Sequence, residues 1–243
     1  MNSHDPTTLL IFTLGPGSEQ ARRQWFDSEN AAVERDFNAC CLQAVVAAGR
    51  EAGFSLRVSS PGAQPLVDDA SLDRQSERSF RRRLTGAIDR AMDESAGPLV
   101  VVGTDTPGLT SKHLLAAQAA LVSNPEDIVV GPAADGGIYL LAAARPISDL
   151  LTGVRWRSAR TLASLLEILE AAGRTVRLLP VLADLDSRAD LERWLALGPN
   201  GEWWRNVVRR LLTAVRQVVE HLPPAAVPVQ VWRAVPIGRA PPR

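Results

Sequence analysis

Short apolar runs alternate with amphipathic segments along most of the chain. Runs with the length and composition of strands lie at 9–14, 54–59, 98–103, 127–130, 138–142 and 176–179. Apolar residues recur at helical spacing over 33–48, 77–92, 111–121, 158–171 and 190–197. The run Leu99–Val102 is apolar throughout, which is typical of a central parallel strand covered on both faces. This alternation predicts an α/β fold built on a parallel sheet.

The C-terminal part follows a different pattern. Residues 202–222 carry one apolar stripe with most arginines off it, which predicts an amphipathic helix. From Pro223 onward the chain is rich in proline and cannot be helical. We therefore expect one domain over 1–200 and an extension over 201–243. The helix is expected to pack on its own domain or to join two copies in a homodimer, and a membrane-surface role is less favoured.

The charge balance bears on the binding partners of the protein, and the cysteines bear on its cellular compartment. The 243 residues have a formal net charge of zero, which gives no argument for binding nucleic acid or a membrane. Cys40 and Cys41 are adjacent and have no other thiol to pair with, which favours a reducing, cytoplasmic compartment. The first apolar run is too short for a signal peptide or a membrane span.

An acidic residue follows the most strand-like run. Asp105 comes directly after "VVGT" and before "TPGLT". In open α/β sheets ligands bind beyond the carboxyl ends of the strands, so Asp105 is a candidate for a metal or ligand site. The alternative is a turn or cap residue, since aspartate is common in such turns.

Two further acidic points follow later strands. "GPAADGGIYLLA" places Asp135 before Gly136 and Gly137, which predicts a hairpin, a ligand-binding loop, or a hairpin whose tip lies at a site. Asp184 and Asp186 are two residues apart, so in extended chain both carboxylates lie on one side. Asp186 could instead begin the following helix, for which Ser187 and Asp190 resemble a capping box. Converging carboxylates of this kind suit a hard divalent cation bound together with a diphosphate.

The motifs "VVGTDTPGL", "GPAADGGIYLL", "GVRW" and "LADLDSRADL" resemble, in this order and spacing, the DUF2064 family. This family consists of nucleotide-diphospho-sugar transferase-like proteins with the GT-A fold, and the resemblance covers about 9–197. It implies a GT-A-like mixed, mostly parallel sheet between helices. The C-terminal helix is expected as an extension beyond this region. The resemblance also implies a metal site of Asp105, Asp184 and Asp186 for Mg²⁺ or Mn²⁺, with Asp105 and Asp135 as the catalytic carboxylates. The implied substrate-binding residues are Asp135, Gly136, Gly137 and Trp156.

The nucleotide end departs from the family pattern. Family members carry a lysine in the loop after the first strand, whereas "LGPGSEQARRQW" has none, and Lys112 is the only lysine in the chain. Arg22 and Arg23 are the nearest substitutes, and arginine also binds phosphate. In "QSERSFRRRL" the family's Gln75 and Arg83 persist, while Ser76, Arg81 and Arg82 replace other motif residues. The resemblance implies these nucleotide-binding residues: Leu14, Gly15, Gly17, Arg22, Arg23, Gln75 and Thr104.

Together these features predict an enzyme. It is expected to transfer a glycosyl group from a nucleotide-diphospho-sugar to a small-molecule acceptor with Mg²⁺ or Mn²⁺. The first alternative is a nucleotidyltransferase that makes a nucleotide-diphosphate product, and the second is a non-catalytic descendant that binds a nucleotide. A dinucleotide-binding protein is a weaker alternative, because Gly15 and Gly17 are followed by Gln20 where the fingerprint needs a third glycine.

Overall fold

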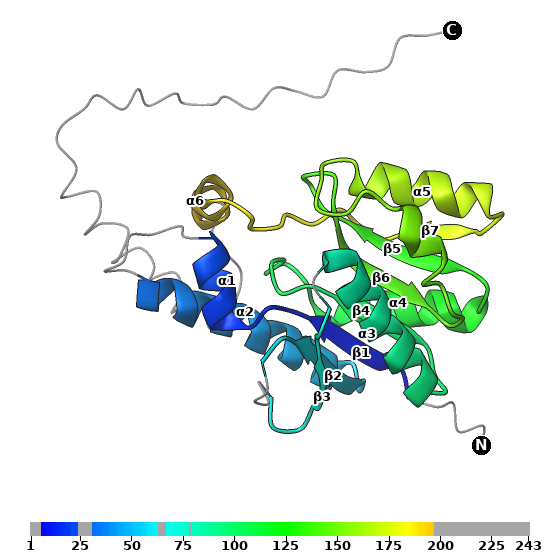
Figure 1. The fold of residues 1–243 in the computed structure, drawn as a ribbon, viewed down its shortest axis with the longest axis horizontal. Coiled ribbons are helices and arrows are strands. Elements are labelled where there is room, and N and C mark those ends of the chain that lie inside the picture. Colours follow the sequence, from blue (N-terminus) through cyan, green and yellow to red (C-terminus); the bar gives the residue numbers. More distant parts are fainter. Residues whose placement is uncertain (1–5, 24–30, 63–66, 78, 197–243) are drawn as a thin grey trace, which may run out of the picture.

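The computed structural model describes residues 6–23, 31–62, 67–77 and 79–196, without the side chains of 20–23, 195 and 196. Within these ranges the chain forms one seven-stranded sheet of order β3-β2-β1-β4-β6-β5-β7 (Figure 1). The strands are β1 Thr8–Phe12, β2 Ser55–Ser60, β3 Ser71–Arg74, β4 Leu99–Val102, β5 Ile128–Pro132, β6 Ile138–Ala143 and β7 Val176–Leu178. All predicted strands are present, which confirms the α/β prediction.

The sheet is mixed and mostly parallel. Strands β1, β2, β3 and β4 pair in parallel, with Leu9 beside both Leu56 and Val100. Strand β6 runs antiparallel to both of its neighbours, β4 and β5, and β7 pairs in parallel with β5. The carboxyl ends of β1, β4, β5 and β7 therefore lie at one edge of the sheet, which is the edge where the predicted site residues lie.

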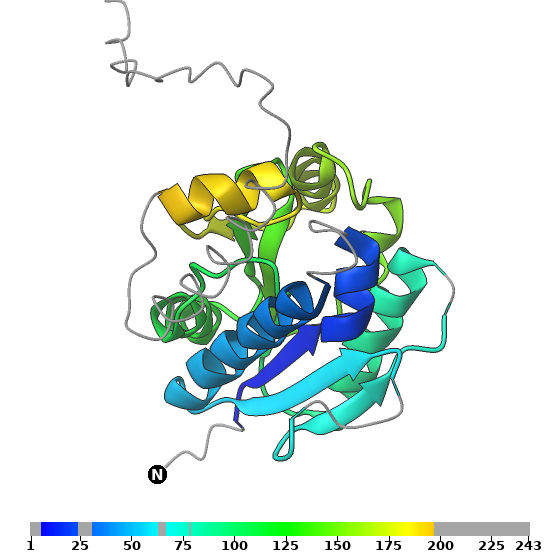
Figure 2. The same ribbon diagram turned by 90° about the vertical axis from the view of Figure 1, so that its left-hand side faces the viewer.

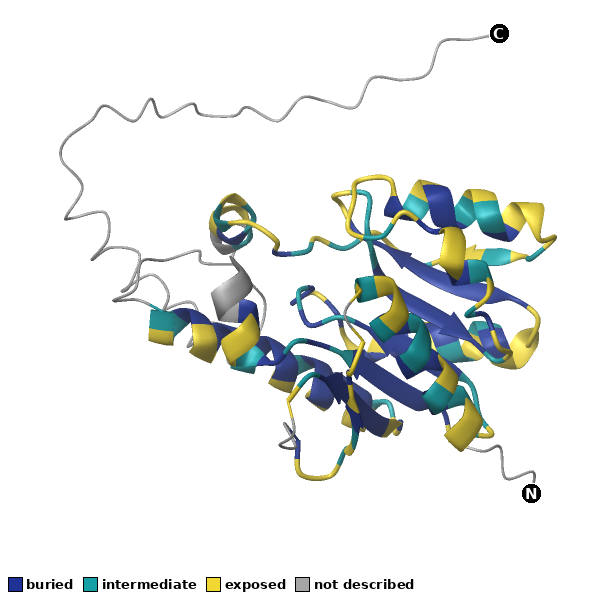
Figure 3. Cartoon of the chain, viewed as in Figure 1, coloured by how far each residue is buried: buried dark blue, intermediate teal, exposed yellow. Residues whose placement is uncertain are grey.

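Helices cover both faces of the sheet. Helices α2 (Ala31–Glu51) and α4 (Ser111–Ser123) pack on one face, where α2 runs alongside β1 and β2 (Figure 2). Helices α3 (Phe80–Glu94) and α5 (Thr161–Ala171) pack on the other face. Alternate strand residues divide between the two cores: Leu9 and Ile11 face α2, whereas Leu10 faces α3. The strands are buried throughout the middle of the sheet (Figure 3), as the apolar runs predict.

Two elements form outside the predicted strands and helices. Helix α1 (Pro16–Arg23) begins with proline, which is favourable at the first position of a helix because the N–H group there has no partner within the helix. The neighbouring Gly15 and Gly17 are more typical of a loop, so the sequence does not indicate a helix here. Strand β3 has only four residues at the edge of the sheet, and its one buried side chain is an aspartate, Asp73. Neither element has the apolar periodicity by which a strand or helix is predicted.

Two short helices complete the described elements: η2 (Leu150–Gly153), which precedes α5, and α6 (Arg188–Ala196), which follows β7. Ser187 and Asp190 form the predicted capping box, since Asp190 N donates to Ser187 Oγ and Ser187 N to Asp190 Oδ2. The predicted helix 202–222 and the proline-rich tail lie outside the described residues. Within the described ranges, none of the helices combines the length and apolarity that crossing a membrane requires.

Candidate functional site

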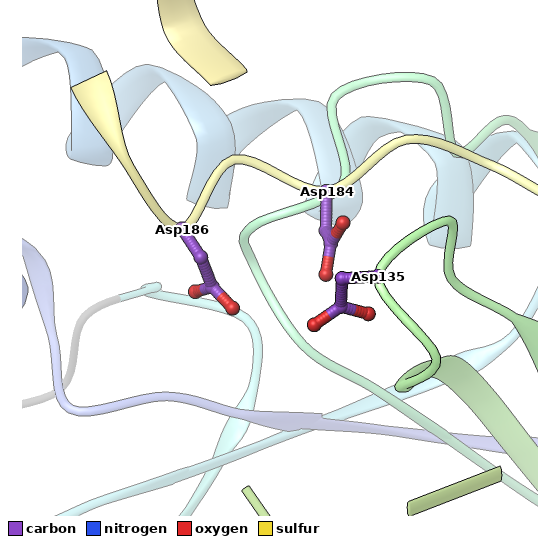
Figure 4. Close-up of side chains that lie close together, drawn as sticks. All are labelled: Asp135, Asp184 and Asp186. Carbon is purple, nitrogen blue, oxygen red and sulfur yellow. The ribbon is translucent and has the colours of Figure 1, made fainter. Parts of the chain in front are cut away.

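Three carboxylates gather at the edge of the sheet where β4, β5 and β7 end. Asp135, Asp184 and Asp186 each offer an oxygen, and these oxygens all lie within 4.8 Å of one another (Figure 4). They come from two chain segments that lie about 50 residues apart in the sequence. Asp105, which follows β4, lines the same cavity but does not belong to this group of three.

Asp135 is held at the tip of the hairpin that joins β5 and β6. Its Oδ1 accepts a hydrogen bond of 2.6 Å from Gly137 N, and Ala133 N donates to Gly137 O across the turn. Gly136 has φ of +91°, which a residue with a side chain rarely adopts. The Asp-Gly pair is thus a hairpin turn, and the same turn presents the Asp135 carboxylate at the site.

Backbone hydrogen bonds hold the segment after β7 beside this hairpin. Leu182 N donates to Pro132 O and Ala134 N to Leu182 O, at 3.1 and 2.9 Å. Further along, Leu185 N donates to Asp105 O at 2.8 Å, which ties the segment to the end of β4. Leu185 is 1% exposed and packs in a small core with Phe37 of α2.

This anchoring explains why Asp184 and Asp186 lie together. Leu185, between the two aspartates, is buried. Figure 4 shows the side chains of Asp184 and Asp186 pointing to the same side of the segment, toward Asp135. The cap of α6 is provided by Ser187, so Asp186 is not needed to begin that helix. The two carboxylates, two residues apart, therefore lie on one side of the segment, as the sequence predicts.

The crowding of acids changes the protonation of the site. Burial and the neighbouring charge of Asp135 are the main causes that raise the pKa of Asp184 to about 7, and Asp186 and Asp105 add to the effect. Three carboxylates this close repel one another unless a proton or a cation lies among them. The cluster, which offers only hard oxygen donors, fits a divalent cation such as Mg²⁺ or Mn²⁺.

The carboxylates open onto a cavity of about 540 Å³. Predicted site residues that line it are Leu14, Thr104, Asp105, Asp135, Gly137, Trp156, Asp184 and Asp186. Four others do not line it: Gly15, Gly17, Gln75 and Gly136. Arg22 and Arg23 belong to α1, but their side chains lie outside the described part of the structure.

The residues away from the cavity wall support those on it. Gln75 is buried, and its Nε2 donates to Thr13 O and Ser59 O, so it joins the ends of β1 and β2. Gly136 lies against α5, where Leu162 N donates to Gly136 O at 2.9 Å. Gly15 has φ of +83° and allows the turn between β1 and α1. Each of these residues positions a loop that reaches the cavity.

Several lining residues are absent from the set that the sequence predicts. They include Phe12, Glu19, Phe80, Arg83, Tyr139, Arg157, Ser158 and several apolar strand residues. Phe80 contacts both Phe12 and Trp156, with ring centroids 5.6 and 5.8 Å apart. Arg83 persists from the family motif in "QSERSFRRRL", and that is the signal by which it could have been found. No pattern in the sequence marks Phe12 or Arg157 as neighbours of the site.

Comparison of the chain with protein families gives one match. The profile of DUF2064, described as "Uncharacterized protein conserved in bacteria", matches residues 36–158, half of the chain. The chain belongs to the DUF2064 family. This confirms the resemblance stated from the motifs. None of the curated proteins compared with the chain matches it.

Solved structures show that this DUF2064 protein shares its fold with several bacterial proteins. A candidate nucleotide-diphospho-sugar transferase from Desulfovibrio desulfuricans G20 has a TM-score of 0.74 and 20% identity, covering 87% of this chain and 97% of the other. The homologue of Rv0371c from Mycobacterium sp. strain JC1 has a TM-score of 0.53 and 21% identity, covering 84% and 97%. Rv0371c from Mycobacterium tuberculosis H37Rv has a TM-score of 0.50 and 18% identity, covering 79% and 97%. The fold is that of nucleotide-diphospho-sugar transferase-like proteins, as predicted.

Proposed function

We propose that this DUF2064 protein is a transferase that uses a divalent metal and a nucleotide-diphospho-sugar to glycosylate a small-molecule acceptor. The observation that carries the proposal is the group formed by Asp135, Asp184 and Asp186 at the edge of the cavity. Carboxylates at the carboxyl ends of strands, in this fold, suit a Mg²⁺ or Mn²⁺ ion that takes its remaining ligands from phosphate and water.

The metal ligands are the first part of the proposal. The oxygens of Asp135, Asp184 and Asp186 are close enough to share one ion. Asp105, which the family pattern makes a metal ligand, lies in the same cavity, and its charge helps to raise the pKa of Asp184. When bound, the ion supplies positive charge that stabilises a diphosphate leaving group.

The reaction needs a carboxylate to act as base. In glycosyl transfer the bond from the anomeric carbon to the diphosphate oxygen breaks, and a bond to an acceptor oxygen forms. The acceptor's hydroxyl proton must pass to a base within reach. Asp105 and Asp135 are the two exposed or half-buried cavity carboxylates outside the 183–187 segment, and we assign the role to Asp105 because Asp135 belongs to the metal group.

The first test is metal binding. Mn²⁺ titrated into the protein and followed by electron paramagnetic resonance should bind at one site. Asp186→Asn should weaken this binding, whereas Asp93→Asn, an exposed carboxylate at the end of α3, should leave it unchanged. Equal Mn²⁺ affinity in wild type and Asp186→Asn would contradict a metal site at the cluster.

The second test distinguishes glycosyl transfer from nucleotidyl transfer. Nucleotide-sugars with different bases are incubated with the protein and Mg²⁺, and released nucleoside diphosphate is measured. Release of nucleoside diphosphate supports glycosyl transfer. Release of pyrophosphate from a nucleoside triphosphate and a phosphorylated acceptor would assign a nucleotidyltransferase instead, and binding without either product would favour a non-catalytic nucleotide-binding role.

A further inference from the structure

We infer that Arg83 is a second recognition point in the cavity and binds a carboxylate or phosphate group on the sugar or acceptor. This inference rests on the proposed function, because it names the chemical class of the ligand that the same cavity takes. The cavity then has a cation-binding end formed by aspartates and an anion-binding point on α3. The ligand would carry an anionic group in addition to any diphosphate.

The surroundings of Arg83 are the first observation. Arg83 lines the cavity and is half-buried, and its Nε is buried with no hydrogen-bond partner. Within the described ranges, no carboxylate lies close enough to its guanidinium to form an ion pair. An arginine that lines a cavity and has no carboxylate partner leaves its positive charge available to an anionic ligand in that cavity.

The other arginines of the same turn behave differently. Arg81 is exposed and donates to Thr152 O at 2.8 Å. Arg82 is exposed and does not line the cavity. The first turn of α3 thus holds three arginines and no acidic residue. Because the helix dipole makes this end positive, the turn gains stability when an anion binds there, and Arg83 is the member that reaches the cavity.

The wall beside Arg83 is apolar and aromatic. Phe80 lies three residues earlier on α3, and its ring contacts Phe12 and Trp156. The apolar residues Leu84, Val101 and Leu141 also line the cavity. Arginine forms paired hydrogen bonds with carboxylates and phosphates, and an aromatic surface packs against the apolar faces of a sugar ring. A sugar or hydroxylated acceptor with one anionic group combines both features.

Three sugars that share one ring test this inference. Glucose, glucuronate and glucose 6-phosphate are titrated into the protein in the presence of EDTA, with binding measured from the shift in melting temperature. Wild type should bind glucuronate or glucose 6-phosphate at least about tenfold more tightly than glucose. Whichever of the two binds identifies the anionic group as carboxylate or phosphate.

Variants of the first turn of α3 show which residue is responsible. Arg83→Gln should lose the preference for the anionic sugar, and Arg83→Lys should keep part of it because the charge remains. Arg82→Gln is the matched control and should bind as wild type does. Circular dichroism and Mn²⁺ binding, both unchanged in Arg83→Gln, would show that the fold and the metal end are intact.

The inference is overturned if wild type binds no anionic sugar more tightly than glucose, or if Arg83→Gln retains the preference. It is also overturned if a nucleoside diphosphate with Mg²⁺ displaces the anionic sugar, because Arg83 would then hold the diphosphate itself. Failure of the proposed function would appear elsewhere, as absent Mn²⁺ binding in wild type. The two failures are therefore read from separate measurements.

Discussion

Gly136 shows how one residue at the site is constrained by its surroundings. Its φ is +91°, and a Cβ added there would lie 2.2 Å from Ala159 O. Gly173, at the end of α5, also has a positive φ, +67°, but an added Cβ would meet nothing within 4 Å. Comparing alanine substitutions at Gly136 and Gly173 therefore separates two losses in the free energy of unfolding: the loss due to the positive φ and the loss due to the steric clash.

Gly136→Ala is expected to destabilise the protein more than Gly173→Ala does. The positive φ alone costs an alanine about 1–2 kcal/mol, and the contact with Ala159 adds to this at position 136 only. Denaturant unfolding of both variants measures the difference. Equal losses at the two positions would show that the loop after Trp156 moves aside without cost.

Asp184 illustrates a conflict between stability and function at a single side chain. Its carboxylate is half-buried next to the negative charges of Asp135 and Asp186. Without a cation, the repulsion among these carboxylates lowers the stability of the folded protein. Such a loss of stability is common where side chains are arranged for binding.

Asp184→Asn is expected to weaken Mn²⁺ binding by at least about tenfold, because one charged ligand is lost. In EDTA the same variant should melt at the same temperature as wild type or higher, because the repulsion is relieved. Melting with and without Mn²⁺ measures both effects, and Asp93→Asn is the control. A variant that is less stable in EDTA and binds Mn²⁺ normally would indicate a purely structural carboxylate.

At the scale of elements, the short strand β3 is held in place by charge. Asp73 is 3% exposed, and its carboxylate accepts hydrogen bonds from Ser59 Oγ on β2 at 2.6 Å and from Arg90 Nη2 on α3 at 3.1 Å. Arg57 Nη2 lies 3.6 Å from the same carboxylate. Burial acts to raise the pKa of Asp73, but the hydrogen bonds and the arginine charges outweigh it, so the pKa lies below its ordinary value.

The free energy of unfolding is expected to fall in acid because of Asp73. A carboxyl whose pKa is lower in the folded state contributes stability above its unfolded pKa of about 3.9, and this stability is lost as the pH falls through the folded value. Asp73→Asn should cost about 2 kcal/mol or more at pH 7. The variant should also lose less stability than wild type when the pH is lowered below about 4.

Unfolding by urea from pH 7 downward tests this prediction. Asp69→Asn is the control, since Asp69 pairs with Arg50 at the surface and both side chains are at least half exposed. The control should change stability by about 1 kcal/mol or less. If Asp73→Asn follows the pH profile of wild type, the carboxylate does not hold β3 to α3.

At the scale of the whole molecule, the site joins parts of the chain that are distant in sequence. The hairpin with Asp135 and the segment with Asp184 are linked by a few backbone hydrogen bonds, and the second segment also binds the end of β4. A ligand that bridges them stabilises the folded state only, because the unfolded chain does not bring them together.

Saturation with Mn²⁺ and a cognate nucleoside diphosphate is expected to raise the melting temperature of the protein. At about 100 times the dissociation constant, binding contributes about 2.7 kcal/mol, which corresponds to about 5–10 °C for a domain of this size. Differential scanning calorimetry of wild type and Asp186→Asn measures the shift. The variant should show a smaller one, and equal shifts would place the nucleotide away from the cluster.

The sequence determined the class of fold and indicated the acidic residues of the proposed metal site. The strand Leu99–Val102 and the helix predicted over 111–121 form as expected. Their apolar residues can all be buried on the sheet in only one type of secondary structure, so the pattern predicts that structure. The family motifs add a mixed, mostly parallel sheet and the acidic residues as expectations. Helix α1 and strand β3 escape prediction, because a proline, two glycines and a buried aspartate carry no apolar period.

Only the tertiary structure decided which residues meet. The family resemblance implies Asp105 with Asp184 and Asp186 as metal ligands, which stays a prediction, whereas the structure groups Asp135 with the latter two. The contact between Phe80 and Trp156, and the placing of Arg83 on the cavity wall, likewise depend on how α3 packs against the sheet. Spacing along a chain fixes the side of an element on which a residue lies. Distances between segments depend on the packing of whole elements, which no local pattern specifies.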